Sequence, residues 1–202
     1  MSEAMQPGCS GVKGMAGLSR SFYEVACKFT ASMSRGETVQ FVKYPSAAII
    51  LLVSCLEAYL NEFLSLFRQV EAQKRGAAIS ALDGESLETR WMRAPLIFGQ
   101  CPFDAGTEPF QSFHLLVCLR NELVHYDPRF RITSEFPSDK IAALKSKFPF
   151  ACEGQSDWTT QVLNLDCARW ACRTTKALVR RLHELAGGAD MSGWPHPWPD
   201  PS

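Results

Sequence analysis

Apolar side chains recur at intervals of three and four residues through most of the chain, and this helical spacing limits the fold more than any other feature. Runs of Val, Ile and Thr that alternate with polar residues, as strands require, are nearly absent. The sequence therefore predicts an all-α fold, an up-and-down bundle of about five to six helices. Besides a first helix at 18–34, two long helices at 45–75 and 158–186 are expected to flank a helix at 108–126.

Residues with strong start and stop preferences mark the predicted helix ends. Gly76 is expected to end the first long helix. Ser86 is expected to cap a shorter helix that Pro95 disrupts, and Thr107 is expected to cap the next one. The rest of the stretch 77–106 has a mixed pattern that predicts no regular element.

The length of the chain, 202 residues, and its 46% hydrophobic content predict one folded domain and exclude wholesale disorder. Residues 1–16 lack any period and are expected to be loose, and residues 187–202 form a Pro- and Trp-rich tail that is expected to be flexible. The helical domain is expected to span 17–186. Lys and Arg number 21, as do Asp and Glu, so the net charge of zero provides no overall attraction for nucleic acid or an anionic membrane.

Nothing in the sequence predicts secretion or a membrane span. The longest apolar run, 47–53, has seven residues, whereas a membrane-spanning helix needs about 18 or more. The eight cysteines are scattered and form no Cys-x-x-Cys pair, which favours buried thiols in a reducing compartment over disulfides or a zinc site. We therefore expect a cytoplasmic protein without a metal or another cofactor, since the sequence also contains no Gly-rich phosphate loop.

The 108–126 helix carries the candidate chemistry. Arg120 falls in the middle of its apolar face, where an arginine needs a partner, and Asn121 and His125 lie four residues apart on the flank. Glu57, with Asn61 one turn later on the first long helix, is the expected partner of Arg120. A guanidinium that binds phosphate oxygens, an amide that orients it and a titrating imidazole are together suited to a phosphodiester.

Residues 120–125 (RNELVH) resemble the Arg-x4-6-His signature of the HEPN superfamily, in which a polar residue often follows the arginine directly. The stretch 51–63 (LLVSCLEAYLNEF) is similar to the Glu- and Asn-bearing helix of several HEPN families. The resemblance covers roughly residues 45–186 in helix order and is specific at these two segments.

The resemblance implies a helical bundle that dimerises and so brings two Arg/His motifs into one cleft. Many HEPN proteins are metal-independent endoribonucleases that act as toxins or in anti-phage defence, some under the control of an antitoxin. In that setting His125 would transfer protons, Arg120 would bind the phosphate and Asn121 would orient the site. Attack of a ribose 2′-hydroxyl would leave a 2′,3′-cyclic phosphate and a 5′-hydroxyl.

Residues just past the motif are further candidates. Tyr126 is expected to support the site, and Arg129 and Arg131 are expected to contact RNA. HEPN toxins that are silenced by adenylylation carry a tyrosine two residues beyond the histidine. Asp127 holds that place here, so that form of regulation is not expected.

Each candidate functional residue also has a purely structural interpretation. His125 could simply cap a helix end. A basic stripe on the last helix is best explained as the solvated face of an amphipathic helix; it consists of Arg169, Arg173, Lys176 and Arg180. His114 lies too far from His125 to share a metal with it, and His183 has no acid–base context. The alternative functions are a non-catalytic HEPN module that binds nucleotide, RNA or protein, and an unrelated helical interaction protein.

Overall fold

A computed structural model describes residues 18–34, 43–125, 138–150 and 158–186. Within these ranges the chain forms α-helices and one 3₁₀-helix and contains no strand, which confirms the all-α class. The elements in chain order are α1 (Leu18–Ser34), α2 (Lys43–Val70), α3 (Ala72–Ser80), α4 (Leu87–Arg93), the 3₁₀-helix η2 (Ala94–Phe98), α5 (Phe110–Val124), α6 (Ser138–Lys145), α7 (Trp158–Val162) and α8 (Leu165–Leu185). The described part thus contains eight α-helices, more than the predicted five to six, because several of them are short.

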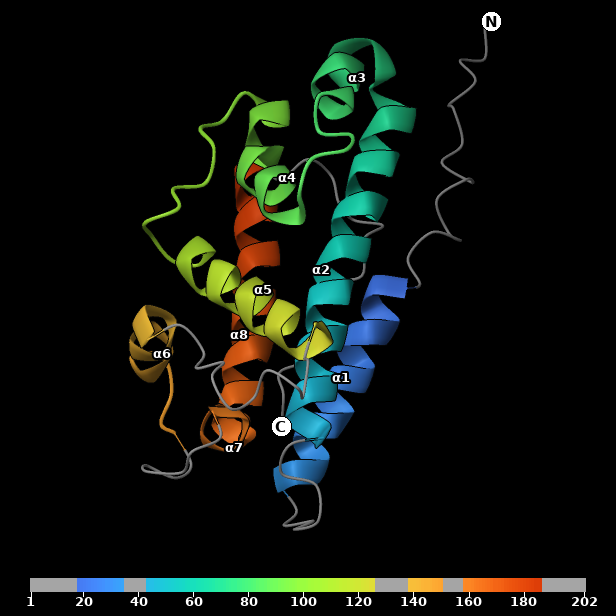
Figure 1. The fold of residues 1–202 in the computed structure, drawn as a ribbon. Helices are drawn as coiled ribbons and strands as arrows, with labels where there is room; N and C mark the ends of the chain where they lie inside the picture. The colour runs from blue at the N-terminus through green and yellow to red at the C-terminus, as the bar shows by residue number, and fades with distance from the viewer. Residues whose placement is uncertain (1–17, 35–42, 126–137, 151–157, 187–202) are drawn as a thin grey trace, which may run out of the picture.

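The two predicted long helices are present as α2, with 28 residues, and α8, with 21 residues. In Figure 1, α1 lies beside α2 and runs in the opposite direction, while α8 rises on the other side. The helix α5 packs against both α2 and α8, as expected, but crosses them obliquely instead of running alongside. This crossing places the start and the end of α5 in different surroundings.

The core forms where the apolar stripe of α2 meets α1, α5 and α8. Leu52, Leu56 and Leu60 of α2 are fully buried, as are Phe113 of α5 and Trp91 of α4. Burial of one such side chain contributes roughly 1.5–3 kcal/mol to folding. The buried side chains of α5 lie between Phe110 and Leu119, and its end at Val124 is partly exposed.

The predicted last helix, 158–186, is divided into two helices, so the prediction of one continuous helix was wrong. Asn164 stands between α7 and α8, where its side-chain oxygen accepts a hydrogen bond from the Cys167 N–H at 2.8 Å. Its amide group also donates to the Pro149 carbonyl at 3.0 Å. Asparagine is among the residues that best satisfy free N–H groups at a helix start, and here this cap begins a new helix.

Gly76 does not end the first long helix, contrary to the prediction. The helix α2 stops earlier, at Val70, and Gly76 lies inside α3 with open space where a side chain would stand. Arg75 pairs with Glu71 and donates to the Ile97 carbonyl at 2.7 Å. This arginine therefore ties α3 to η2, a contact between distant residues that the glycine pattern could not reveal.

The stretch 77–106, which the sequence left largely unassigned, contains α4 and η2. Ser86 caps α4 as predicted, because its hydroxyl oxygen accepts the Thr89 N–H at 3.2 Å. Pro95 stands in the first turn of η2, where the helix changes from α to 3₁₀, as its missing N–H predicts. These signals were local and were therefore visible in the sequence.

The start of α5 differs from the prediction. Its N-cap is Pro109, and Thr107 contributes only its carbonyl, which accepts the Gln111 N–H at 2.9 Å. The side chain that caps the first turn is Glu108, whose carboxylate accepts from the Ser112 N–H at 3.3 Å and from its hydroxyl at 2.8 Å. A carboxylate is favoured at this end of the helix dipole.

Residues Lys43–Gln69 are long and apolar enough to cross a membrane, although the sequence contains no long unbroken apolar run. More than half of that window, 56%, is buried inside the fold. A core helix of a soluble protein has this character, so the helix is weak evidence for a membrane span. The terminal segments predicted to be loose, 1–16 and 187–202, lie outside the described residues.

The cysteines that the structure describes are free thiols. Cys55, Cys167 and Cys172 are buried, as predicted, whereas Cys101 is exposed. Burial raises the pKa of Cys55 and of Cys167, which keeps both thiols protonated and unreactive.

Candidate functional site

The C-terminal end of α5 carries the three residues that the sequence singled out. Arg120 and Asn121 lie in its last turns, and His125 is its C-cap. The His125 N–H donates to the Asn121 carbonyl at 2.9 Å and so continues the helical pattern by one residue. Tyr126, Arg129 and Arg131 lie outside the described residues.

The Arg120 side chain is half-buried, and its orientation is set by its neighbour. Its Nη1 donates to the Asn121 side-chain oxygen at 3.0 Å. Its Nε is buried and has no hydrogen-bond partner in the part of the chain that the structure describes. An unsatisfied buried donor costs about 1–3 kcal/mol, and such groups often occur where a site serves binding. The Asn121 amide therefore orients a guanidinium whose Nε–H can still donate a hydrogen bond.

His125 is exposed, and so is Asn121. Both side chains project from the last turn of α5, beside Val124, which is 48% exposed. This end of the helix thus presents an amide and an imidazole to solvent next to an apolar side chain.

The predicted pair of Arg120 with Glu57 is not formed, which corrects the expectation from the sequence. Glu57 is exposed, and no ion pair joins it to Arg120 among the described residues. Asn61 accepts a hydrogen bond from Arg90 of α4 at 2.5 Å, so it holds α4 against α2. Both residues lie on the solvent edge of α2, which the spacing along one helix could not distinguish from the side that faces α5.

The basic stripe on α8 has the character of a solvated face. Arg169 pairs with Asp166 at 3.8 Å, and Arg180 pairs with Glu184 at 3.8 Å, both along the same helix. The opposite face of α8 is buried. Partners of opposite charge within the stripe weaken its attraction for phosphates, so it is not a good candidate for an RNA surface.

The sequence analysis missed a contact of His183 with the buried Tyr59. Its Nε2 forms a short hydrogen bond with the hydroxyl of Tyr59, a residue 124 positions away. The ring of Tyr59 packs on Trp91 with centroids 6.1 Å apart, and burial raises the pKa of its hydroxyl. The hydrogen bond gives the buried Tyr59 hydroxyl a partner inside an aromatic cluster. No local sequence pattern predicts a pair of residues so far apart.

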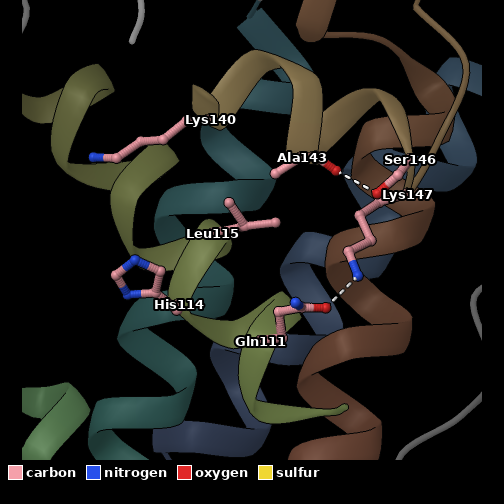
Figure 2. A pocket seen from close by; sticks show the side chains of 7 residues that line it. All are labelled: Gln111, His114, Leu115, Lys140, Ala143, Ser146 and Lys147. Atoms are coloured by element: carbon pink, nitrogen blue, oxygen red, sulfur yellow. Dashed lines mark hydrogen bonds between the residues drawn. The ribbon is translucent and has the colours of Figure 1, made fainter. Parts of the chain in front are cut away.

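A pocket with a volume of about 400 Å³ lies between α5 and α6 (Figure 2). The residues that line it are Gln111, His114, Leu115, Lys140, Ala143, Ser146 and Lys147. His114 bonds through Nδ1 to a Glu88 oxygen at 2.5 Å, and its Nε2 lies 3.7 Å from the Cys118 sulfur. In the described part of the chain no group of three His, Cys, Asp or Glu side chains is placed to hold a metal ion.

A scan of the chain against protein-family models found no match, and searches of curated proteins and of solved structures found none either. The HEPN resemblance therefore depends on the two sequence segments that carry it.

Proposed function

We propose that this chain is a metal-independent endoribonuclease of the HEPN type. The joint placement of Arg120, Asn121 and His125 at the C-terminal end of α5 supports this proposal. Neither the guanidinium nor the imidazole is sealed inside the subunit, since Arg120 is half-buried and His125 is exposed. A substrate phosphate at this helix end would meet both groups.

The reaction is the attack of a ribose 2′-hydroxyl on the adjacent phosphorus. His125 moves a proton between the nucleophile or leaving oxygen and solvent, while Arg120 donates hydrogen bonds to the phosphate oxygens, which become more negative in the transition state. Asn121 holds the guanidinium in place. The leaving 5′-oxygen takes a proton, and the products are a 2′,3′-cyclic phosphate and a 5′-hydroxyl.

The working form is a homodimer. One histidine cannot easily act as the base and the acid of the same step, and a second copy related by a two-fold axis supplies another. The exposed Val124 beside the motif offers an apolar contact to that copy. The setting that we propose is a cytoplasmic toxin or anti-phage defence protein, with an antitoxin or other regulatory partner as its control.

The decisive experiment is the incubation of labelled RNA with the purified protein in EDTA, followed by analysis of the ends that are formed. His125→Ala is expected to lower the cleavage rate about 10²–10⁴-fold, which is the usual contribution of a general acid or base. Arg120→Ala is expected to lower the cleavage rate by a factor of the same order. Arg20→Ala provides a matched control, because Arg20 is an exposed arginine of α1 that pairs with Glu24 at 2.7 Å.

The other outcomes separate the alternatives. RNA that is bound but intact would indicate a non-catalytic module that uses the same helix end. A monomer at micromolar concentration with no effect on RNA would indicate a helical interaction protein and would overturn the HEPN proposal. Cleavage that persists in both variants would remove His125 and Arg120 from the site.

A further inference from the structure

A second polar group joins three residues that the ribonuclease proposal does not use. Glu88 lies in the first turn of α4, and His114 and Cys118 lie one turn apart on α5. The Glu88 carboxylate contacts His114 Nδ1 at 2.5 Å, and His114 Nε2 lies 3.7 Å from the Cys118 sulfur. A thiol, an imidazole and a carboxylate thus stand in sequence, each within hydrogen-bond reach of the next.

The order of the contacts fixes what the imidazole can do. A carboxylate only accepts, so the proton of a neutral His114 belongs on Nδ1, where Glu88 holds it. The lone pair of Nε2 then points at the Cys118 thiol and can accept its proton. This is the arrangement of nucleophile, base and orienting acid that serves covalent catalysis.

The thiol needs such a base. Burial raises the pKa of Cys118, and the nearby Lys140 ammonium only partly offsets this effect. The resting group is therefore a protonated thiol, which reacts slowly unless a neighbour removes its proton as the new bond forms. Cys118 is half-buried, whereas the His114 side chain is 54% exposed and can be reached from solvent.

The pocket between α5 and α6 begins at the same imidazole. His114 and Lys140 line it together on one side, as Figure 2 shows, and the Lys140 ammonium lowers the pKa of the nearby Cys118 thiol. Leu115 and Ala143 give it an apolar wall. Its volume of about 400 Å³ suits a small organic molecule.

We propose that Cys118 is an acyl-accepting nucleophile, with His114 as its base, and that the α5–α6 pocket seats a small carboxylic ester or thioester. The sulfur forms a bond with the carbonyl carbon while the thiol proton passes to His114 Nε2. The ammonium of Lys140 stabilises the negative oxygen of the tetrahedral intermediate. The bond to the leaving oxygen or sulfur then breaks, and that atom takes the proton from His114.

An S-acyl cysteine remains after this step. Water that attacks its carbonyl, again with His114 as the base, releases the carboxylic acid and restores the thiol. Glu88 contacts neither reactant and is a positioning residue, which holds the imidazole ring in the required orientation.

The test uses p-nitrophenyl acetate as the acyl donor, with release of p-nitrophenolate and peptide mass spectrometry as the two readouts. We expect an acetyl group on Cys118 that forms at least about ten times faster than on Cys101, the exposed loop thiol. Cys118→Ala should abolish the fast phase, and Cys101→Ala should preserve it. Acetylation confined to Cys101 and other exposed thiols would overturn the proposal.

His114→Gln and Glu88→Gln locate the proton transfer. His114→Gln should slow acetylation of Cys118 by about 10²-fold or more, and Glu88→Gln by about tenfold. Circular dichroism and thermal unfolding show whether each variant is folded, and Glu88→Asp should recover part of the rate. A Cys118 rate that does not change in folded His114→Gln would show that the imidazole is not a base. RNA cleavage is measured on the same samples, so failure of either activity leaves the other testable.

Discussion

The two halves of α5 carry polar groups that are assembled in different ways. At its C-terminal end, Arg120, Asn121 and His125 come from one short segment, in which Asn121 and His125 are exposed and Arg120 is half-buried. His114 and Cys118, which lie six and two residues before Arg120, depend on Glu88 from α4 and lie beside a pocket that α6 completes. The first group is placed by one helix, and in the function that we propose it acts together with a second copy. The second group is placed by the tertiary fold.

Phe113→Ala should have the largest effect and should damage both groups together. Phe113 is fully buried in the first turn of α5, with its ring 5.3 Å from that of Phe110 and 6.0 Å from that of Trp91. We expect a loss of about 3–5 kcal/mol in the free energy of unfolding, measured by urea titration. Leu96→Ala is the control, because Leu96 is 45% exposed and should change stability by less than about 0.5 kcal/mol.

The results for Phe113→Ala and Leu96→Ala show whether the two polar groups of α5 depend on the same core. If Phe113→Ala stayed folded and lost only Cys118 acetylation, the C-terminal end of α5 would be independent of the core. If it lost only RNA cleavage, the pocket would be the independent part.

Asn121→Ala should act at the C-terminal end alone. It removes the 3.0 Å hydrogen bond that orients Arg120 and should lower RNA cleavage about tenfold, or about 1.4 kcal/mol in the barrier. Because Asn121 is exposed, unfolding and the acetylation of Cys118 should be unchanged. Asn61→Ala should not affect cleavage, because Asn61 bonds Arg90 instead. Equal loss of cleavage in both variants would contradict this assignment.

The same contrast explains how far the sequence could predict the molecule. The Ser86 cap joins residues three positions apart, so the sequence alone predicted it, and the Arg120–Asn121 contact joins adjacent residues. His114 meets Glu88 across 26 positions, and His183 meets Tyr59 across 124. Such pairs depend on how helices cross, which no local pattern contains.

The expectations that were wrong have the same cause. The stripe on α2 showed which residues share a helix face but not where α5 would cross it, so Glu57 was assigned to Arg120 and is in fact exposed. Gly76 was a plausible helix end, but α2 ends at Val70 and Gly76 lies inside α3, where Arg75 contacts Glu71 and the Ile97 carbonyl. Helix period and the Ser86 cap were local properties, whereas the partners of each helix were tertiary ones.

Ser86→Ala should affect only the group that contains His114 and Cys118, and its effect should be smaller than that of Asn121→Ala on RNA cleavage. Its hydroxyl caps α4, and loss of such a cap costs about 0.5–2 kcal/mol. Because Glu88 sits in the first turn of that helix, acetylation of Cys118 should slow a few-fold, while RNA cleavage should stay constant. Ser80→Ala, at the exposed end of α3, is the control. A parallel change in RNA cleavage would mean that the two halves of α5 are coupled.

The smallest effect is expected from pH at the start of α5. Burial raises the pKa of Glu108, but hydrogen bonds from Lys147 and Ser112 outweigh this effect, so the pKa is lowered overall. A lowered pKa in the folded state means that the carboxylate stabilises the fold above its ordinary value of about 4.3, and that this stability is lost as the pH falls through the folded value. The contribution should be below about 1 kcal/mol, because the Glu108 side chain is 52% exposed.

Glu108→Gln tests this effect of pH on stability and shows which part of α5 the Glu108 carboxylate stabilises. The difference in unfolding free energy from the unmodified chain should be largest near neutral pH and should shrink below about pH 4. Hydrogen exchange compared at one pH should be faster in the variant at the Ser112 amide, which donates to Glu108 at 3.3 Å. The His125 amide, which donates to the Asn121 carbonyl at 2.9 Å, should be unaffected. Equal acceleration at both amides would show that α5 frays as one unit, and the two halves would then have to be treated as a single site.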